Sequence, residues 1–242
     1  MGVAAFLGIS FLFTWSLLPW ARTSTPIGLL ALFGPAVGAL VVSAAGGKEA
    51  LAALGTRLLD WRCRPRWYLF ALGVPVVVSL LRSALEFLWG APGPVEPQAI
   101  NSLALIVAAL VIGEELGWRG YLLPQLQRNL GPWQASTLIG LAWAAWHLPL
   151  FYMPGMPQFG RPFPAFIGYT IALSVLLTAL AGGTRGSVLL ATCFHAAVNT
   201  LGFVNTAATP SLRGWSDAAS YGLAALFVGM LAWPRPRRAR GG

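Results

Sequence analysis

Long apolar runs, separated by short connections that hold most of the charges, constrain this chain more than any other feature. Of its 242 residues, 57% are hydrophobic and only 10% are charged, which lies outside the range of soluble globular domains. A run of about 20 apolar residues is long enough to cross a bilayer as a helix. Such runs occur at 1–20, 26–45, 67–89, 99–123, 133–150, 165–181, 186–204 and 218–233. The sequence therefore predicts an all-α, polytopic transmembrane bundle of about eight helices.

The two ends of the chain are consistent with one integral membrane domain over residues 1–242. The first run carries no charge and is followed by no small-residue cleavage site, so we interpret it as a membrane helix and not as a signal peptide. A Gly34-Pro35 step inside the second run predicts a kink. Residues 234–242 form a basic tail.

The segment from 48 to 66 has a different composition from the runs around it. Basic residues alternate there with leucines and a tryptophan at helical spacing, which is typical of an amphipathic helix lying in the membrane interface. We expect it to anchor the protein on the membrane surface. The connection 151–164 is rich in Pro and Gly. It is too short for a domain and is expected to form a lid or a re-entrant loop.

Basic residues in the connections and the tail are distributed unequally between the two sides of the predicted membrane. Eleven of the fourteen lie on the side that holds the 46–66 connection and the tail, and the positive-inside rule places that side in the cytoplasm. Both termini are therefore predicted to be cytoplasmic. The net charge of +9 points to anionic lipid headgroups, because no nucleic-acid-binding module is visible.

Two adjacent acids, Glu114 and Glu115, lie inside the fourth apolar run. A carboxylate in a bilayer is costly, and such residues usually face a polar interior where they carry out a function. Glu115 and Arg119 are four residues apart, with the acid first, which favours an ion pair on one helix face. Glu114 lies about 100° around the helix and lacks that partner, so it is the candidate general base. A purely structural charge cluster between helices remains an alternative.

The chain has two histidines, and both lie in apolar runs. His147 ends the fifth run, and His195 lies in the seventh together with Asn199, four residues further on. Residues at i and i+4 share a helix face, so His195 and Asn199 can direct two donors to one point, as in an oxyanion hole. Each histidine could instead make an ordinary hydrogen bond between helices.

Other hydrolytic chemistries fit the sequence less well. Asp60 and Asp217 both lie at the edges of predicted spans, so they do not form a membrane aspartyl dyad. A His-Glu-x-x-His zinc motif is absent, and Ser187 has neither a nucleophile elbow nor an adjacent base. A zinc site formed by Glu114, His147 and His195 is chemically allowed.

Three motifs on separate predicted helices resemble those of the CAAX protease and bacteriocin-processing family, also called CPBP or Abi, which includes type II CAAX prenyl endopeptidase. The motifs are Glu-Glu-x-x-x-Arg, Phe-x-x-x-His and His-x-x-x-Asn/Asp/Ser. In this chain they read Glu114-Glu115-Leu-Gly-Trp-Arg119, Trp143-Ala-Ala-Trp-His147 and His195-Ala-Ala-Val-Asn199. The second motif departs from the family pattern, because Trp143 replaces a phenylalanine. The region that bears the motifs spans about residues 99–204.

The resemblance implies a glutamate-dependent intramembrane endopeptidase that needs no metal or other cofactor. Glu114 with His147 would activate the hydrolytic water, Glu115 would be held by Arg119, and His195 with Asn199 would bind the oxyanion. The expected partners are membrane lipids and a peptide or protein substrate, including one with a hydrophobic or lipid-modified segment. The expected location is a bacterial cell membrane.

Two other classes of function are compatible with the same residues. One is a membrane immunity or scaffold protein that keeps the polar cluster for stability, and the other is a proton-coupled transporter, since Glu, His and Arg in spans also form proton relays. A further pair, Arg82 and Glu86 in the third run, is expected to form an ion pair within its helix.

Overall fold

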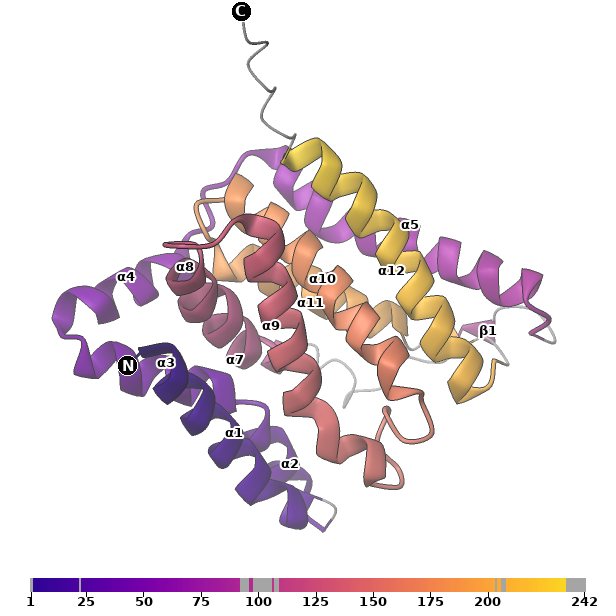
Figure 1. Cartoon of the computed structure of the whole chain (residues 1–242), viewed down its shortest axis with the longest axis horizontal. Helices are drawn as coiled ribbons and strands as arrows, with labels where there is room; N and C mark the ends of the chain where they lie inside the picture. Colours follow the sequence, from indigo (N-terminus) through magenta and orange to yellow (C-terminus); the bar gives the residue numbers. More distant parts are fainter. Residues whose placement is uncertain are drawn as a thin grey trace, which may run out of the picture.

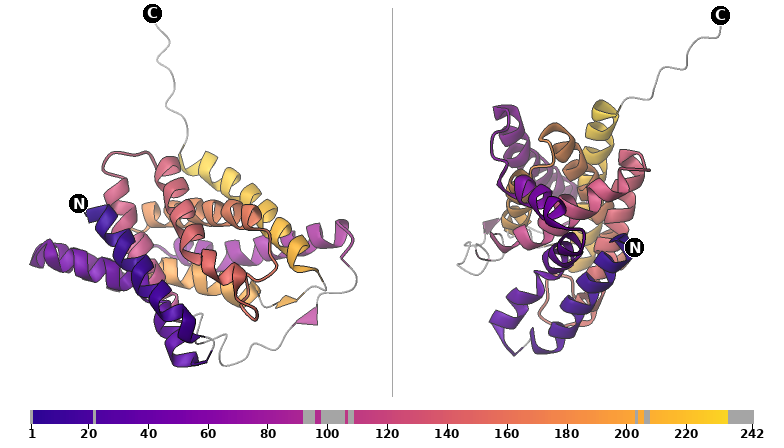
Figure 2. Two further views of the ribbon diagram at one scale, coloured as in Figure 1. Left: turned by 60° about the horizontal axis from the view of Figure 1, so that its bottom comes forward. Right: turned by 90° about the vertical axis from the view of Figure 1, so that its left-hand side faces the viewer.

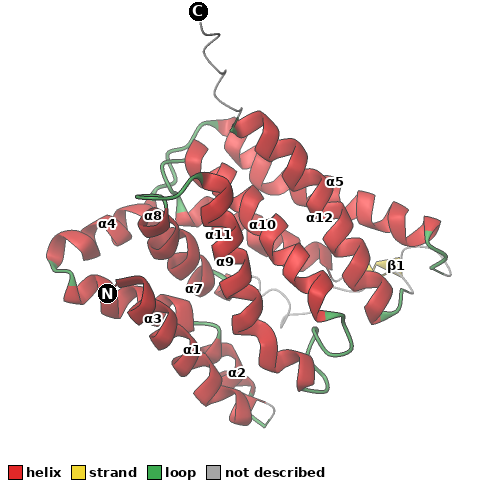
Figure 3. Ribbon diagram, in the orientation of Figure 1, coloured by secondary structure: helices red, strands yellow, loops and turns green. Residues whose placement is uncertain are grey.

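The computed structural model describes residues 2–21, 23–91, 96–97, 106, 109–202, 204–205 and 208–233. The described part is helical apart from an antiparallel pair of two-residue strands, β1 (Glu96–Pro97) and β2 (Val204–Asn205) (Figure 3). The helices before β1 are α1 (Gly2–Ala21), α2 (Thr25–Ala31), α3 (Gly34–Ala45), α4 (Lys48–Leu59) and α5 (Pro65–Leu88). Those after it are α7 (Ile112–Glu115), a π-helix (Leu116–Leu122), α8 (Leu123–Leu126), α9 (Pro132–His147), a 3-10 helix (Leu148–Tyr152), α10 (Phe163–Gly183), α11 (Val188–Gly202) and α12 (Pro210–Ala232).

Proline begins many of these helices. Its fixed φ suits the first turn, where its missing N–H group would have had no partner within the helix. Prolines occupy the first or second position of α2, α5, α9, α10 and α12. The chain bends next to Gly34-Pro35, as predicted, but the helix breaks there instead of kinking: α2 ends at Ala31, α3 begins at Gly34, and the two meet at 48°. Pro124 lies in the first turn of α8, which continues to Leu126.

Glycine allows close helix contacts around this bend. A Cβ on Gly117 of the π-helix would lie 2.6 Å from the Pro35 backbone of α3, and a Cβ on Gly38 would lie 2.8 Å from the Phe6 carbonyl oxygen of α1. Small residues let helix backbones approach closely where no water drives their association. The N-terminal helices and the π-helix therefore pack with their backbones nearly in contact.

The membrane character predicted from the sequence is confirmed at the level of helix length and composition. Three described helices, α1, α5 and α10, are long and apolar enough to cross a bilayer, and the bent pair α2 and α3 adds a fourth. The other predicted spans coincide with helical segments that are shorter or less apolar. Residues 99–105 and 107–108 of the fourth run, Arg22, and the tail at 234–242 lie outside the described residues. The predicted orientation, with both termini in the cytoplasm, stays a prediction.

Helix α10 occupies the centre of the bundle. In its most apolar 18-residue window 72% of residues are buried, against 22% in the windows of α1 and α5. It packs on α9 and α12, while α5 packs on α11 and α12, and α1 packs on α3 (Figures 1 and 2). Of the motif-bearing segments, α9 packs closely on this buried helix, and α11 and the π-helix also contact it.

The amphipathic segment forms α4 at the periphery of the bundle (Figure 1). The helix is shorter than the 48–66 segment, because it ends at Leu59 and residues 60–64 are irregular. Leu54 is its buried residue, whereas Leu51 and Leu59 are exposed. An exposed apolar row beside basic residues agrees with a helix that lies at a membrane surface.

Candidate functional site

Three helical segments carry the predicted site residues, and contacts between them join Glu114 to α9 and Glu115 to α11. Glu114 and Glu115 are the last two residues of α7, and the π-helix that follows them holds Arg119. A π-helical segment inside a helix is rare and is frequently found at a functional site. Trp143 and His147 lie on α9, and His195 lies on α11. The sequence predicted these helices but not the change to π-helical geometry directly after the paired glutamates.

Glu115 joins the π-helix to α11. Its Oε1 accepts hydrogen bonds from Arg119 Nη1 at 3.1 Å and from His195 Nδ1 at 2.8 Å, and its side chain is completely buried. The predicted Glu115–Arg119 pair is therefore present in the structure. The contact between Glu115 and His195 was not predicted, because the two residues are 80 positions apart in the sequence and the contact depends on how their helices face one another.

Arg119 is held from three sides. Besides Glu115, its Nη2 donates to Ser174 Oγ of α10 at 3.0 Å, and its guanidinium lies 4.8 Å from the centre of the Trp143 ring. Arg119 Nε and Glu115 Oε2 are buried and have no hydrogen-bond partner among the described residues. Sequence reasoning missed Ser174, since one serine in an apolar run carries no signal of its own.

Glu114 contacts α9. Its Oε2 accepts a hydrogen bond from the indole Nε1 of Trp143 at 2.8 Å, and only 4% of the residue is exposed. Phenylalanine, the residue of the family motif at this position, has no donor to offer. The Trp143 replacement thus adds an orienting hydrogen bond to the predicted base.

The two histidines are both engaged through Nδ1. His147 Nδ1 lies 3.0 Å from the Trp143 carbonyl oxygen, and because a carbonyl only accepts, this nitrogen carries the proton. His195 Nδ1 faces Glu115, and the edge of its ring lies against Trp143 with the ring centres 5.1 Å apart. In each ring the Nε2 atom has no hydrogen bond to the described residues and remains available to a substrate or a water.

Asn199 lies one turn after His195 on α11 and is half-buried. The described contacts do not link it to Glu114, Glu115 or His147. Ser187, the alternative nucleophile, caps α11: its Oγ accepts from Leu190 N and donates to the Asp60 carbonyl oxygen. Within the described residues, no three His, Cys, Asp or Glu side chains are grouped so that they could hold a metal ion.

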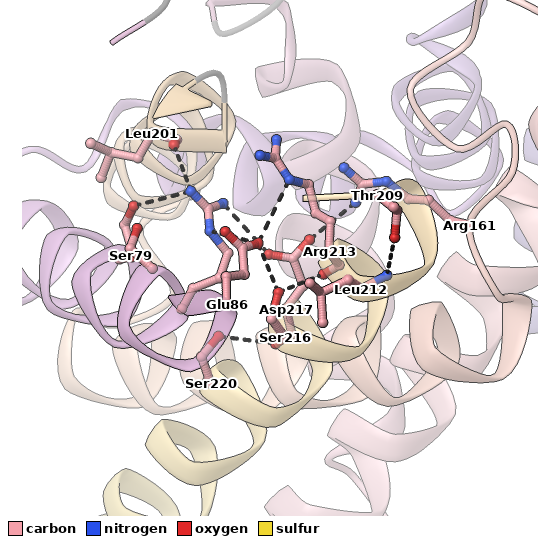
Figure 4. A network of polar contacts seen from close by, with 12 residues as sticks. Ser79, Glu86, Arg161, Leu201, Thr209, Leu212, Arg213, Ser216, Asp217 and Ser220 are labelled. Atoms are coloured by element: carbon pink, nitrogen blue, oxygen red, sulfur yellow. Dashed lines mark hydrogen bonds and ion pairs between the residues drawn. The ribbon is translucent and has the colours of Figure 1, made fainter. Parts of the chain in front are cut away.

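A second charged cluster lies at one end of the bundle, and the sequence predicted only part of it (Figure 4). The predicted pair is formed at 3.9 Å between Arg82 Nε and Glu86 Oε1. Asp217, assigned to a span edge, is buried inside α12, which begins eight residues before the predicted span. Its carboxylate contacts Arg161 at 3.1 Å and Arg82 at 3.6 Å.

The comparisons with known proteins cover the same region as the motifs. Residues 96–201 match the family model of Rce1-like type II CAAX prenyl endopeptidases. A similar curated protein is CAAX prenyl protease 2 of Methanococcus maripaludis, 33% identical over 93 residues. The matched segment is 36% of this chain and 34% of that protein, so the chain spans about a third of the relative's length. Residues 96–201 are therefore similar in sequence to the type II CAAX prenyl endopeptidases.

The family match includes every predicted site residue and excludes much of the second cluster. Glu114, His147 and His195 all lie inside the matched range, as do Glu115 and Asn199. Outside it lie α1 to α5 and α12, with Arg82, Glu86 and Asp217. The matched range therefore contains the motif residues and Arg161, and it leaves out the other members of the charged cluster.

Proposed function

We propose that this protein is a membrane-embedded endopeptidase of the CAAX-protease type, in which a glutamate activates the hydrolytic water and no metal is required. One observation carries the proposal. The buried Glu114 and Glu115 of α7 accept hydrogen bonds from Trp143 of α9 and from His195 of α11, and His147 follows Trp143 by one helical turn. Among the described residues, the Nε2 atom of each histidine has no hydrogen-bond partner. Ionisable groups inside a membrane protein are expensive and generally have a function.

Glu114 is the proposed general base. The Trp143 hydrogen bond occupies Oε2, and Oε1 has no hydrogen bond to the described residues, so it can accept a proton from a water. The water would attack the peptide carbonyl carbon, and the proton held by Glu114 would pass to the leaving amine. His147, with its proton on Nδ1, offers Nε2 as a second acceptor for that water.

His195 and Asn199 are the proposed donors to the oxyanion. With Nδ1 bonded to Glu115, His195 can donate from Nε2 only when the ring carries both protons. Arg119 would then hold Glu115 in place and would not touch the substrate. Removing one oxyanion donor typically lowers turnover by about 10²–10³-fold.

The proposed substrate is a peptide or protein that reaches the site from the lipid phase and carries a hydrophobic or lipid-modified segment. CAAX sequences are carboxyl-terminal and their cysteine is prenylated, which gives such a segment. We further propose that both termini lie in the cytoplasm, from the distribution of basic residues, and that the membrane is a bacterial cell membrane.

The test is cleavage of a farnesylated peptide that ends in a CAAX sequence, with the purified protein in nanodiscs and the products identified by mass spectrometry. Peptides from membranes that contain or lack the protein extend the search to other substrates. Product that forms with the wild type and not with Glu114→Gln supports the proposal. Equal product from both proteins contradicts it, and solute uptake into proteoliposomes would favour a transporter.

A further inference from the structure

The second charged cluster contacts the end of α11, which carries His195, and it includes Arg161 from the connection that follows His147. It comprises Arg82, Glu86, Arg161, Arg213 and Asp217, with Ser216 as a hydrogen-bond donor to Glu86 at 2.9 Å (Figure 4). Its members come from α5, α12 and the connection that precedes α10. Arg82, Glu86 and Asp217 are at most 7% exposed.

One arm of this cluster reaches α11. Arg82 Nη2 donates to the Leu201 carbonyl oxygen at 3.3 Å, one residue before α11 ends. The last carbonyls of a helix have no partner within it, and a positive charge there also interacts favourably with the helix dipole. Asn199 lies two residues before Leu201, and His195 lies one turn earlier. Arg82 therefore fixes the end of the helix that carries the proposed oxyanion donors.

The other arm reaches the segment that follows His147. This connection begins with the 3-10 helix and ends at Arg161, whose Nη1 donates to Asp217 Oδ2 at 3.1 Å. Phe151 of the connection packs on Phe166 of α10 with ring centres 5.1 Å apart, and Phe166 in turn packs on His147 at 5.3 Å. Arg161 therefore closes a connection whose aromatic side chains support the His147 ring.

Asp217 links the two arms, because its two carboxylate oxygens contact Arg82 and Arg161 separately. We propose that this cluster is a positioning site for the reaction: through Asp217, Arg82 and Arg161 set the relative placement of His195 with Asn199 on α11 and of His147 on α9. The inference rests on the proposed function for its catalytic consequence. The linkage itself is a property of the fold and can be tested without a substrate.

Stability alone does not account for such a cluster. Replacing a buried ion pair with apolar residues of similar volume is often neutral or stabilising, because desolvation offsets the attraction between the charges. What a set of directed ionic contacts adds is one defined geometry. Catalytic groups need a defined geometry, because a misplacement of about 1 Å can lower a reaction rate by about 10²-fold.

The experiment compares Arg82→Gln, Arg161→Gln and a matched control, Arg185→Gln, each purified in nanodiscs. Arg185 also forms an ion pair, with Asp60 at 2.9 Å, but its side chain is 69% exposed. Arg161 is 22% exposed in its side chain and Asp217 keeps Arg82 as a partner, so Arg161→Gln is expected to fold even if Arg82→Gln does not. The measurements are amide hydrogen exchange by mass spectrometry and steady-state cleavage of the farnesylated CAAX peptide.

We expect Arg82→Gln to speed amide hydrogen exchange at residues 197–202, and Arg161→Gln to speed it at residues 148–161, with smaller changes elsewhere. In the control, exchange at both segments should equal that of the wild type. The kcat of both variants should fall by roughly ten- to hundredfold, with KM nearly unchanged. A folded Arg161→Gln protein with wild-type exchange at 148–161 refutes the linkage. If hydrogen exchange changes but kcat stays within twofold of wild type, the cluster does not position the catalytic groups. If the wild-type protein does not cleave the peptide, the proposed function is refuted, and the exchange data still decide whether the cluster links the two segments.

Discussion

Glu115 offers the sharpest test of how the site is held together. Glu115→Gln keeps the shape of the side chain and an oxygen that can accept from His195 and Arg119, but it removes the negative charge. Arg119, with no exposed side-chain surface, would then face Ser174, the Trp143 ring and a neutral amide oxygen in place of a carboxylate. Leaving one member of a buried pair uncompensated costs about 3–5 kcal/mol.

That loss of stability should be large enough to measure in detergent. For a protein of this size about 1 kcal/mol corresponds to about 2–4 °C in Tm, so Glu115→Gln should lower Tm by roughly 6–20 °C. The matched control is Asp60→Asn, which breaks the exposed pair with Arg185 and should change stability by less than about 1 kcal/mol. Thermal unfolding of both variants beside the wild type gives the comparison.

A double-mutant cycle then separates the charge pair from general damage. Glu115 Oε2 and Arg119 Nε are already without partners among the described residues, so the pair carries part of its desolvation penalty in the native protein. Glu115→Gln combined with Arg119→Met should therefore be less destabilised than the sum of the two single changes, by about 1–3 kcal/mol. Additive changes, or a Glu115→Gln protein within about 1 kcal/mol of wild type, would refute the reasoning.

Three further predictions concern topology, the Trp143 contact and metal independence. Cys63 should react with a membrane-impermeant maleimide only from the cytoplasmic side. Burial raises the pKa of its thiol, so the thiolate fraction at pH 7 is reduced and labelling should become faster as the pH rises toward that pKa. Labelling from outside intact cells would overturn the predicted orientation. Trp143→Phe should fold and cleave about tenfold more slowly, because it loses the donor to Glu114 but keeps a ring beside Arg119 and His195. Trp143→Ala should also lose about 3–5 kcal/mol of stability. A Trp143→Phe protein that cleaves at the wild-type rate would contradict the role of the hydrogen bond to Glu114. Cleavage should persist in a strong chelator, and its loss with recovery on adding zinc alone would favour a metal site at Glu114, His147 and His195.

Much of the architecture was predictable because it depends on local chemistry. Apolar runs located α1, α5 and α10 almost to the residue, and Gly34-Pro35 located the bend between α2 and α3. The Glu115–Arg119 pair followed from spacing within one segment. In each case the determining interactions lie within a few residues of one another in the chain.

The remaining features depend on how helices face each other, which periodicity does not specify. Hydropathy identified α10 but gave no sign that it is the central helix or that Ser174 contacts Arg119. Likewise, Glu115 rather than Glu114 faces His195, and Asp217 meets Arg161 from 56 residues away. A lone serine or aspartate in a helix carries no sequence signal for such distant contacts.

The central claim, that Glu114 is the base that activates water, is tested most directly by the turnover of Glu114→Gln. The change preserves shape and an acceptor for the Trp143 N–H, and removes the group that takes the proton. The purified variant should keep the Tm of the wild type within a few degrees and release no peptide above background from the farnesylated CAAX substrate. A folded Glu114→Gln protein that cleaves this substrate at a near-native rate would contradict the mechanism.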